Sequence, residues 1–207
     1  MSHKSRRNLG YLFFAFAALI SGGMYWRYSQ QELWGYAPLF LYLMLYGGVL
    51  LLLTFRRDGS YQGNNRYSAL SGLLLGLGFP GILPVPLLLL GAFIPLFLLH
   101  RRLVAQEAGY GRVFAHGFST FLLYNILATY WVTNTSIGAG LFAMLANTLL
   151  MCLPWLAFHW TSRQSPKVAY LAFAACWITF EYFHYNWELN WPWLTLGNGF
   201  AQWPSLV

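Results

Sequence analysis

The residue pair best suited to chemistry in this sequence is Glu181 and His184, near the end of the chain. The Glu-x-x-His spacing places both side chains on one face of a helix. In di-iron bundles this motif forms half of a metal site, which also needs a second copy and further carboxylates, and only Glu188 lies nearby. We therefore expect no metal. We favour a carboxylate close to a membrane interface, partnered by His184 or by the backbone of the following loop. An ionisable group is costly to place at that depth of the membrane, so this carboxylate is still a candidate functional residue.

Three histidines, His100, His116 and His159, fall near the ends of apolar runs at similar depth. Facing histidines can ligate haem, but here each imidazole is expected to reach water or lipid phosphate, so we expect no cofactor. Tyr124 and Asn125 lie within an apolar run and are read as interhelical hydrogen-bond partners rather than a transport site. The sequence contains no Gly-x-Ser-x-Gly, His-Glu-x-x-His or phosphate-binding glycine loop. We assign no catalytic residue from these patterns.

The two cysteines, Cys152 and Cys176, each fall in the middle of a predicted span. They are interpreted as small buried apolar residues, not as a disulfide or a metal pair.

The composition determines the fold class. Hydrophobic residues make up 58% of the chain and charged residues 8%, against roughly 25% in soluble domains. We therefore predict an all-α, polytopic membrane helical bundle. The net charge of +7 comes from short basic clusters between apolar runs, which argues against nucleic acid as a partner.

The apolar runs predict about seven transmembrane helices. The first is retained, not cleaved as a signal peptide, because no clear cleavage site follows it. Between 67 and 99 the apolar stretch is too long for one helix and is interrupted at Phe79-Pro80-Gly81, so two spans are expected there, the first with Gly72-x-x-x-Gly76 as a weak packing signal. The other spans are predicted at 9–26, 34–55, 113–132, 137–160 and 168–185.

The basic residues fix the predicted topology. If the seven spans alternate, nearly every Lys and Arg falls on one side of the membrane and only Arg27 on the other. The positive-inside rule then places the amino terminus in the cytoplasm and the Trp191-Pro192-Trp193 segment outside. Trp187, Trp191 and Trp193 suit the headgroup layer, and Pro192 predicts that the last helix stops at or before it.

Several motifs in this order resemble those of the apolipoprotein N-acyltransferases, over roughly 69–207. They are Gly76-Leu-Gly-Phe79-Pro80, Gly117-Phe118 leading to Tyr130-Trp131-Val132, Trp177-x-x-x-Glu181, and Trp191-Pro192-Trp193-Leu194-x-x-Gly197. Two departures from the family's pattern stand out. His184 replaces the usual arginine, and residues 1–66 add two spans. We therefore divide the chain into a two-helix amino-terminal extension, 1–66, and a membrane bundle, 67–207.

The resemblance implies an enzyme of the bacterial plasma membrane. Such an enzyme transfers an acyl chain from a phospholipid to the amino group of a lipoprotein's diacylglyceryl cysteine. The family works through a cysteine thioester, with a glutamate base and an oxyanion-stabilising lysine in a nitrilase-like domain outside the membrane. None of that domain is in these 207 residues. We expect a fragment, the amino-terminal membrane part, inactive alone.

Four residues are our candidates for the floor beneath the active site: Trp131, Glu181, Trp191 and Trp193. An equal alternative is that they are interfacial anchors and a helix-packing contact. The expected partners are the phospholipid acyl donor, the diacylglyceryl lipoprotein and the membrane, with no nucleic acid. The rival hypothesis is a non-enzymatic membrane protein, either a small transporter or a partner subunit of a separate catalytic chain.

Overall fold

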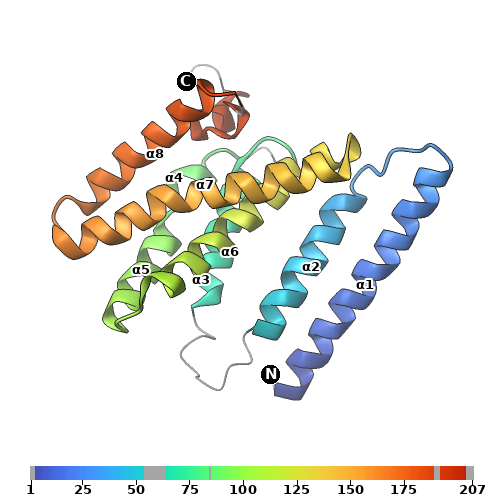
Figure 1. Cartoon of the computed structure of the whole chain (residues 1–207), viewed down its shortest axis with the longest axis horizontal. Helices are drawn as coiled ribbons and strands as arrows, with labels where there is room; N and C mark the ends of the chain where they lie inside the picture. The colour runs from blue at the N-terminus through green and yellow to red at the C-terminus, as the bar shows by residue number, and fades with distance from the viewer. Residues whose placement is uncertain (1–2, 54–63, 84, 189–191, 204–207) are drawn as a thin grey trace. The chain divides into compact units, whose positions relative to one another are not determined.

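The computed structural model describes residues 3–53, 64–83, 85–188 and 192–203, and all regular secondary structure in these ranges is helical (Figure 1). The predicted all-α class is therefore confirmed. The helices are α1 (His3–Ser29), α2 (Ala37–Leu53), α3 (Asn65–Gly78), α4 (Leu88–Gly91), α5 (Ile94–Ala105), α6 (Tyr110–Thr129), α7 (Ile137–Gln164) and α8 (Ala169–Tyr185), with 3-10 turns η1 (Tyr130–Asn134), η2 (Pro192–Leu194) and η3 (Leu196–Phe200).

The helices fall where the apolar runs predict them, but not all are long enough to cross a bilayer unaided. Among the described residues, three stretches are long and apolar enough, namely Lys4–Ser29, Leu88–Ala105 and Ile137–Gln164. The helix Ala37–Leu53 is apolar but shorter. With 14 residues, α3 is about 21 Å long, less than the roughly 30 Å hydrocarbon core. Seven crossings therefore stay a prediction.

The chain forms two compact units. The first unit contains Met1–Arg66 together with Thr129–Met144, and the second contains Tyr67–Ala128 together with Leu145–Val207. Residues 129–144, which we assigned by sequence to the 67–207 bundle, thus cluster with the amino-terminal helices. The helix α7 begins in the first unit and continues into the second.

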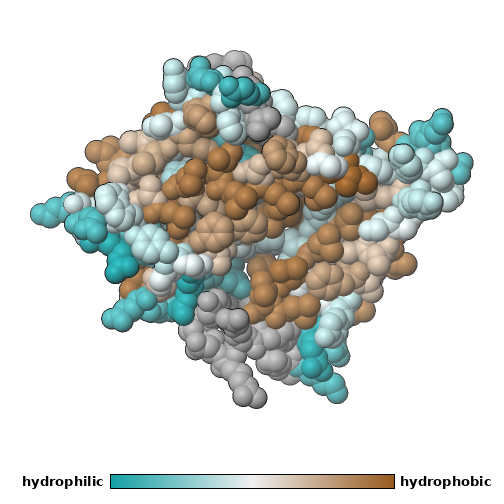
Figure 2. Space-filling model, viewed as in Figure 1, coloured by the Kyte–Doolittle hydropathy of each residue, from teal (hydrophilic) through white to brown (hydrophobic). Residues whose placement is uncertain are grey.

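In the first unit, α1 and α2 form an antiparallel hairpin (Figure 1). Glycine permits their close approach, because a Cβ atom at Gly47 would lie 2.5 Å from the Phe13 ring. The Trp34 indole donates a hydrogen bond to the Met24 carbonyl at 2.8 Å and so fixes the connecting loop. Figure 2 shows hydrophobic residues midway along the hairpin and hydrophilic residues at its ends, the distribution expected of membrane helices.

In the second unit, the Gly72-x-x-x-Gly76 motif lets α3 approach α6. A Cβ atom at Gly72 would lie 2.6 Å from the Thr120 carbonyl oxygen, and one at Gly76 would lie 2.6 Å from Leu127 Cβ. The packing role predicted for this motif is confirmed. Small residues at such contacts give helices in lipid the van der Waals packing that the hydrophobic effect cannot supply there.

A buried polar cluster joins α6 to α7. Asn147 donates a hydrogen bond to Asn125 Oδ1 at 2.8 Å, and Asn125 donates to Thr148 Oγ1 at 3.3 Å. All three side chains are buried. The predicted role of Asn125 as an interhelical partner is confirmed, while Asn147 and Thr148 are partners that the sequence analysis missed.

We predict that Gly72→Ala destabilises the protein by about 1–3 kcal/mol, because the new methyl group meets backbone that cannot rotate away. Thermal unfolding in detergent micelles measures the effect. Gly111→Ala is the matched control, since a Cβ atom at this helical glycine of α6 has nothing within 4 Å. Equal midpoints for the two variants would refute the close contact between α3 and α6.

Candidate functional site

The candidate site lies in the second unit, where the chain leaves α8 and returns along η2 and η3. We call residues 192–200 the return segment. The last helix ends at Tyr185, ahead of Pro192, as predicted. The return segment then runs in short 3-10 turns, which leave many of its backbone groups in need of other partners.

Glu181 supplies the central contact of this site. Its Oε1 atom accepts hydrogen bonds from the Trp177 indole at 2.9 Å and from the Leu196 backbone N–H at 2.8 Å. The first bond comes from one turn earlier on α8, and the second from the return segment. A partner in the backbone of the following loop, one of the two options expected for this carboxylate, is therefore observed. Charge-assisted bonds of this kind are about twice as strong as neutral ones.

Two other contacts fix the return segment on the second unit. The Tyr124 hydroxyl of α6, fully buried, donates to the Leu194 carbonyl at 3.2 Å. At Gly199 the backbone packs so closely on α4 that a Cβ atom would overlap the Leu89 side chain. Within the segment, the Asn198 amide donates to the Pro192 carbonyl at 2.8 Å. The segment is thus held from α4, α6 and α8.

Beneath the return segment lies a small cavity of about 10 Å³, which has room for about one water molecule. His184 lines it with only 4% of its surface exposed, and neither ring nitrogen has a hydrogen-bond partner among the described residues. The ring packs edge-on to Phe180, with centroids 4.6 Å apart. Polar groups of Asn147, Glu181 and Thr195 share the cavity lining, so a water placed there would have partners.

The four predicted site residues are placed differently. Glu181 and Trp193 belong to the second unit, where the Trp193 side chain is 40% exposed. Trp191 lies outside the described residues. Trp131 belongs to the first unit, in η1, and is 46% exposed.

The turn that carries Trp131 is anchored by the hairpin of the first unit. The Tyr42 hydroxyl and the Thr133 hydroxyl lie 3.0 Å apart in a hydrogen bond, and the Asn134 amide donates to the Gly35 carbonyl at 3.1 Å. The Tyr36 ring stacks on Tyr130 with centroids 5.7 Å apart. Contacts on both sides of Trp131 therefore hold the turn that carries it.

The three histidines near the helix ends are buried, with exposures of 4% for His100, 3% for His116 and 1% for His159. The expectation that each reaches water or lipid phosphate was wrong, because the rings bond inside the protein instead. His100 Nε2 lies 3.0 Å from His159 Nδ1, and His116 Nδ1 lies 2.9 Å from the Ser68 hydroxyl. Packing among aromatic side chains such as Trp155 and Phe158 withdraws the first pair from solvent.

Both cysteines are free thiols. Cys152 is buried at 1% exposure in α7, as predicted, and Cys176 is partly buried in α8. A reactive cysteine needs access and a neighbour that stabilises its thiolate. Cys152 lies among core residues and lacks that access.

Comparisons with known proteins find matches over the part of the chain that contains the return segment. A family model described as the apolipoprotein N-acyltransferase N-terminal domain matches residues 71–207. The apolipoprotein N-acyltransferase of Chlorobaculum tepidum is 29% identical over 136 residues, which cover 64% of this chain and 25% of that protein. The matched region thus spans about a quarter of the relative's length. No solved structure matches the chain.

We predict that Glu181→Ala releases the return segment, because the Leu196 N–H and the Trp177 indole lose their acceptor, at about 1–3 kcal/mol for each donor left unsatisfied. Limited proteolysis in micelles should then cut within 192–200. Glu181→Gln keeps a carbonyl oxygen in place and should be cut more slowly than Glu181→Ala. Glu188→Ala, which removes a nearby exposed acid, is the control. Resistance of Glu181→Ala would contradict the anchoring role.

Proposed function

Because this chain belongs to the apolipoprotein N-acyltransferase family, we propose that it supplies the membrane part of such an enzyme. The proposed reaction moves an acyl chain from a phospholipid to the amino group of a lipoprotein's diacylglyceryl cysteine. One observation carries the proposal. The return segment and the carboxylate that anchors it lie inside the family-matched residues 71–207.

Within that enzyme, Glu181 acts as a positioning residue. Its Oε1 atom already accepts two N–H bonds, one of them from the return segment, so the carboxylate serves as an anchor and not as a free base. A thioester mechanism needs an accessible thiolate with a base beside it. Cys152 is too buried for that role. We propose that the catalytic groups lie in a part of the enzyme other than the described residues.

The floor of the site is the return segment, with Trp193 as its exposed aromatic residue. Trp131 and Trp191 are proposed to contribute in the same way. An indole ring suits this task because its apolar body contacts acyl chains while its N–H bonds to headgroups. Glu181 keeps the floor rigid, and a rigid floor maintains the distance between a bound lipid and the reacting atoms.

In the proposed topology, about seven spans cross the bacterial plasma membrane, with the amino terminus in the cytoplasm. The asymmetry of basic residues supports this, because Arg27 alone falls on the outer side. The return segment then lies at the outer surface, where lipoprotein substrates meet phospholipid.

The rival proposal is a non-enzymatic membrane protein, either a small transporter or a partner subunit. The polar cluster of Asn125, Asn147 and Thr148 favours it, because transporters gather polar groups inside the membrane. These side chains bond to one another, however, which is what a structural contact between α6 and α7 requires. The partner-subunit version is tested by reading the transcript beyond the codon for Val207. A stop codon there would assign the catalytic groups to a separate chain.

We predict that Glu181→Gln slows acyl transfer three- to tenfold without blocking membrane insertion, because a neutral acceptor holds the return segment about half as strongly as a carboxylate. The assay follows a labelled acyl chain from phospholipid to a diacylglyceryl peptide, in membranes from cells that produce the full-length enzyme. Glu188→Gln should keep the original rate. Unchanged turnover in Glu181→Gln would remove this residue from the site.

A further inference from the structure

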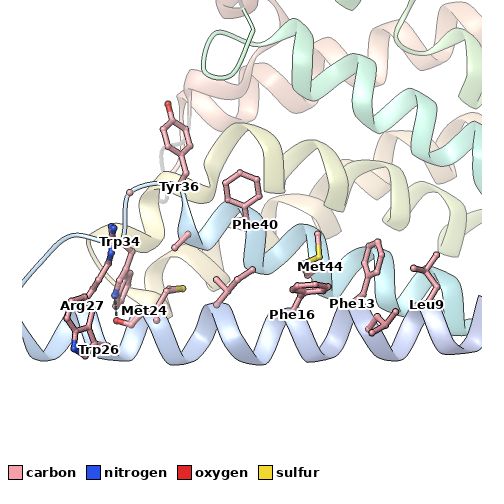
Figure 3. A pocket seen from close by; sticks show the side chains of 15 residues that line it. Leu9, Phe13, Phe16, Met24, Trp26, Arg27, Trp34, Tyr36, Phe40 and Met44 are labelled. Atoms are coloured by element: carbon pink, nitrogen blue, oxygen red, sulfur yellow. Dashed lines mark hydrogen bonds between the residues drawn. The ribbon is translucent and has the colours of Figure 1, made fainter.

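The α1–α2 hairpin of the first unit carries an apolar groove of about 960 Å³ (Figure 3). On α1 its lining follows one helical stripe, in which Leu9, Phe16, Ile20 and Gly23 recur at spacings of three, four and seven residues. Figure 3 shows Phe40 and Met44 of α2 on the other side. The groove lies within residues 9–44, outside the family-matched region, so its ligand is inferred independently of the proposed function.

The helical stripe ends at a positively charged side chain, that of Arg27. Arg27 lies four residues beyond Gly23 and continues the same helical face. It is the only charged residue among the described residues that line the groove, and it is exposed. Its Nη1 atom makes a long bond of 3.4 Å to the Leu33 carbonyl, which leaves most of its five N–H donors for another acceptor. Glu32, in the same loop, is not among the lining residues.

Aromatic side chains surround this end of the groove. Trp26 and Trp34 line it beside Arg27 (Figure 3), and Tyr28 packs near Trp34 with ring centroids 6.3 Å apart. Such rings gather at the headgroup level of a bilayer. The cation of the groove is therefore at the depth of lipid phosphate, while the apolar stripe runs into the hydrocarbon region.

The length of the groove along α1 from Phe16 to Arg27 matches the thickness of one leaflet of a bilayer. From Phe16 to Arg27 the helix rises about 16 Å, and half of the hydrocarbon core is about 15 Å. Gly23 leaves the groove hollow directly next to the cation, because nothing lies within 4 Å of the position that its Cβ would take. A chain that follows the stripe thus meets no side chain at that point.

We propose that this groove binds a phospholipid, with the phosphate on the Arg27 guanidinium and an acyl chain along the stripe past Gly23 towards Phe16. The charge complementarity is specific, because guanidinium matches phosphate with paired N–H donors. An uncharged lipid would leave the cation without its acceptor, and a free anion would leave the stripe empty.

The test is native mass spectrometry of the 207-residue chain released from non-ionic micelles with added dioleoylphosphatidylglycerol. The wild type should retain one lipid. Arg27→Gln should bind it about tenfold more weakly, the effect of one lost charge-assisted bond, and Arg27→Lys should recover part of the affinity. Gly23→Leu fills the hollow and should lower affinity to a similar degree. Gly22→Leu is its matched control, because that position is equally open but does not line the groove.

Two further ligands test whether binding needs both the phosphate and the acyl chains. Dioleoylglycerol, which lacks the phosphate, and inorganic phosphate, which lacks the chains, should both bind at least tenfold more weakly than the phospholipid. The proposal is overturned if dioleoylglycerol is retained as well as phosphatidylglycerol, or if inorganic phosphate alone binds as tightly. Undiminished binding in both Arg27→Gln and Gly23→Leu overturns it as well. A lipid-free dimer would identify a second copy of the chain as the occupant instead.

Discussion

The structure of the candidate site depends on one requirement, that a carboxylate in an apolar helix must find donors. Glu181 meets it with the Trp177 indole and the Leu196 N–H. The second donor lies 15 residues along the chain, beyond Pro192, so satisfying the charge also folds the return segment back onto α8. Without that acceptor, the return segment would lose its bond to Glu181 of α8 and keep its contacts with α4 and α6. A polar group that is expensive to place in an apolar helix thus becomes the anchor of the segment after it.

A second contact holds the return segment, and it depends on close packing between helices. The Tyr124 hydroxyl reaches the Leu194 carbonyl from α6. The position of α6 is set by Gly72 and Gly76 of α3, which bring the two helices into backbone contact, and by Gly117, whose missing side chain makes room for Trp155. In lipid, helices gain little from hydrophobicity, so contacts at small residues decide where a polar side chain can reach.

The local features of this fold could be predicted from sequence, but the contacts between distant residues could not. Apolar runs predicted where the helices lie, and α8 ends before Pro192 as expected, because hydropathy and backbone constraints act on nearby residues. A loop-backbone partner for Glu181 could be expected, yet nothing local indicates that it is Leu196. The burial of His100 and His159 was missed for the same reason, since it results from packing between α5 and α7.

The amino-terminal hairpin contacts the turn that carries Trp131. Residues 1–66 precede the family-matched region, whereas η1 lies inside it, and the two cluster in one unit. Tyr42 bonds Thr133 and Tyr36 stacks on Tyr130, so hairpin residues hold the turn on both sides of Trp131. The hairpin therefore does more than add apolar length, because it holds the turn that carries one of the aromatic residues proposed to contact lipid.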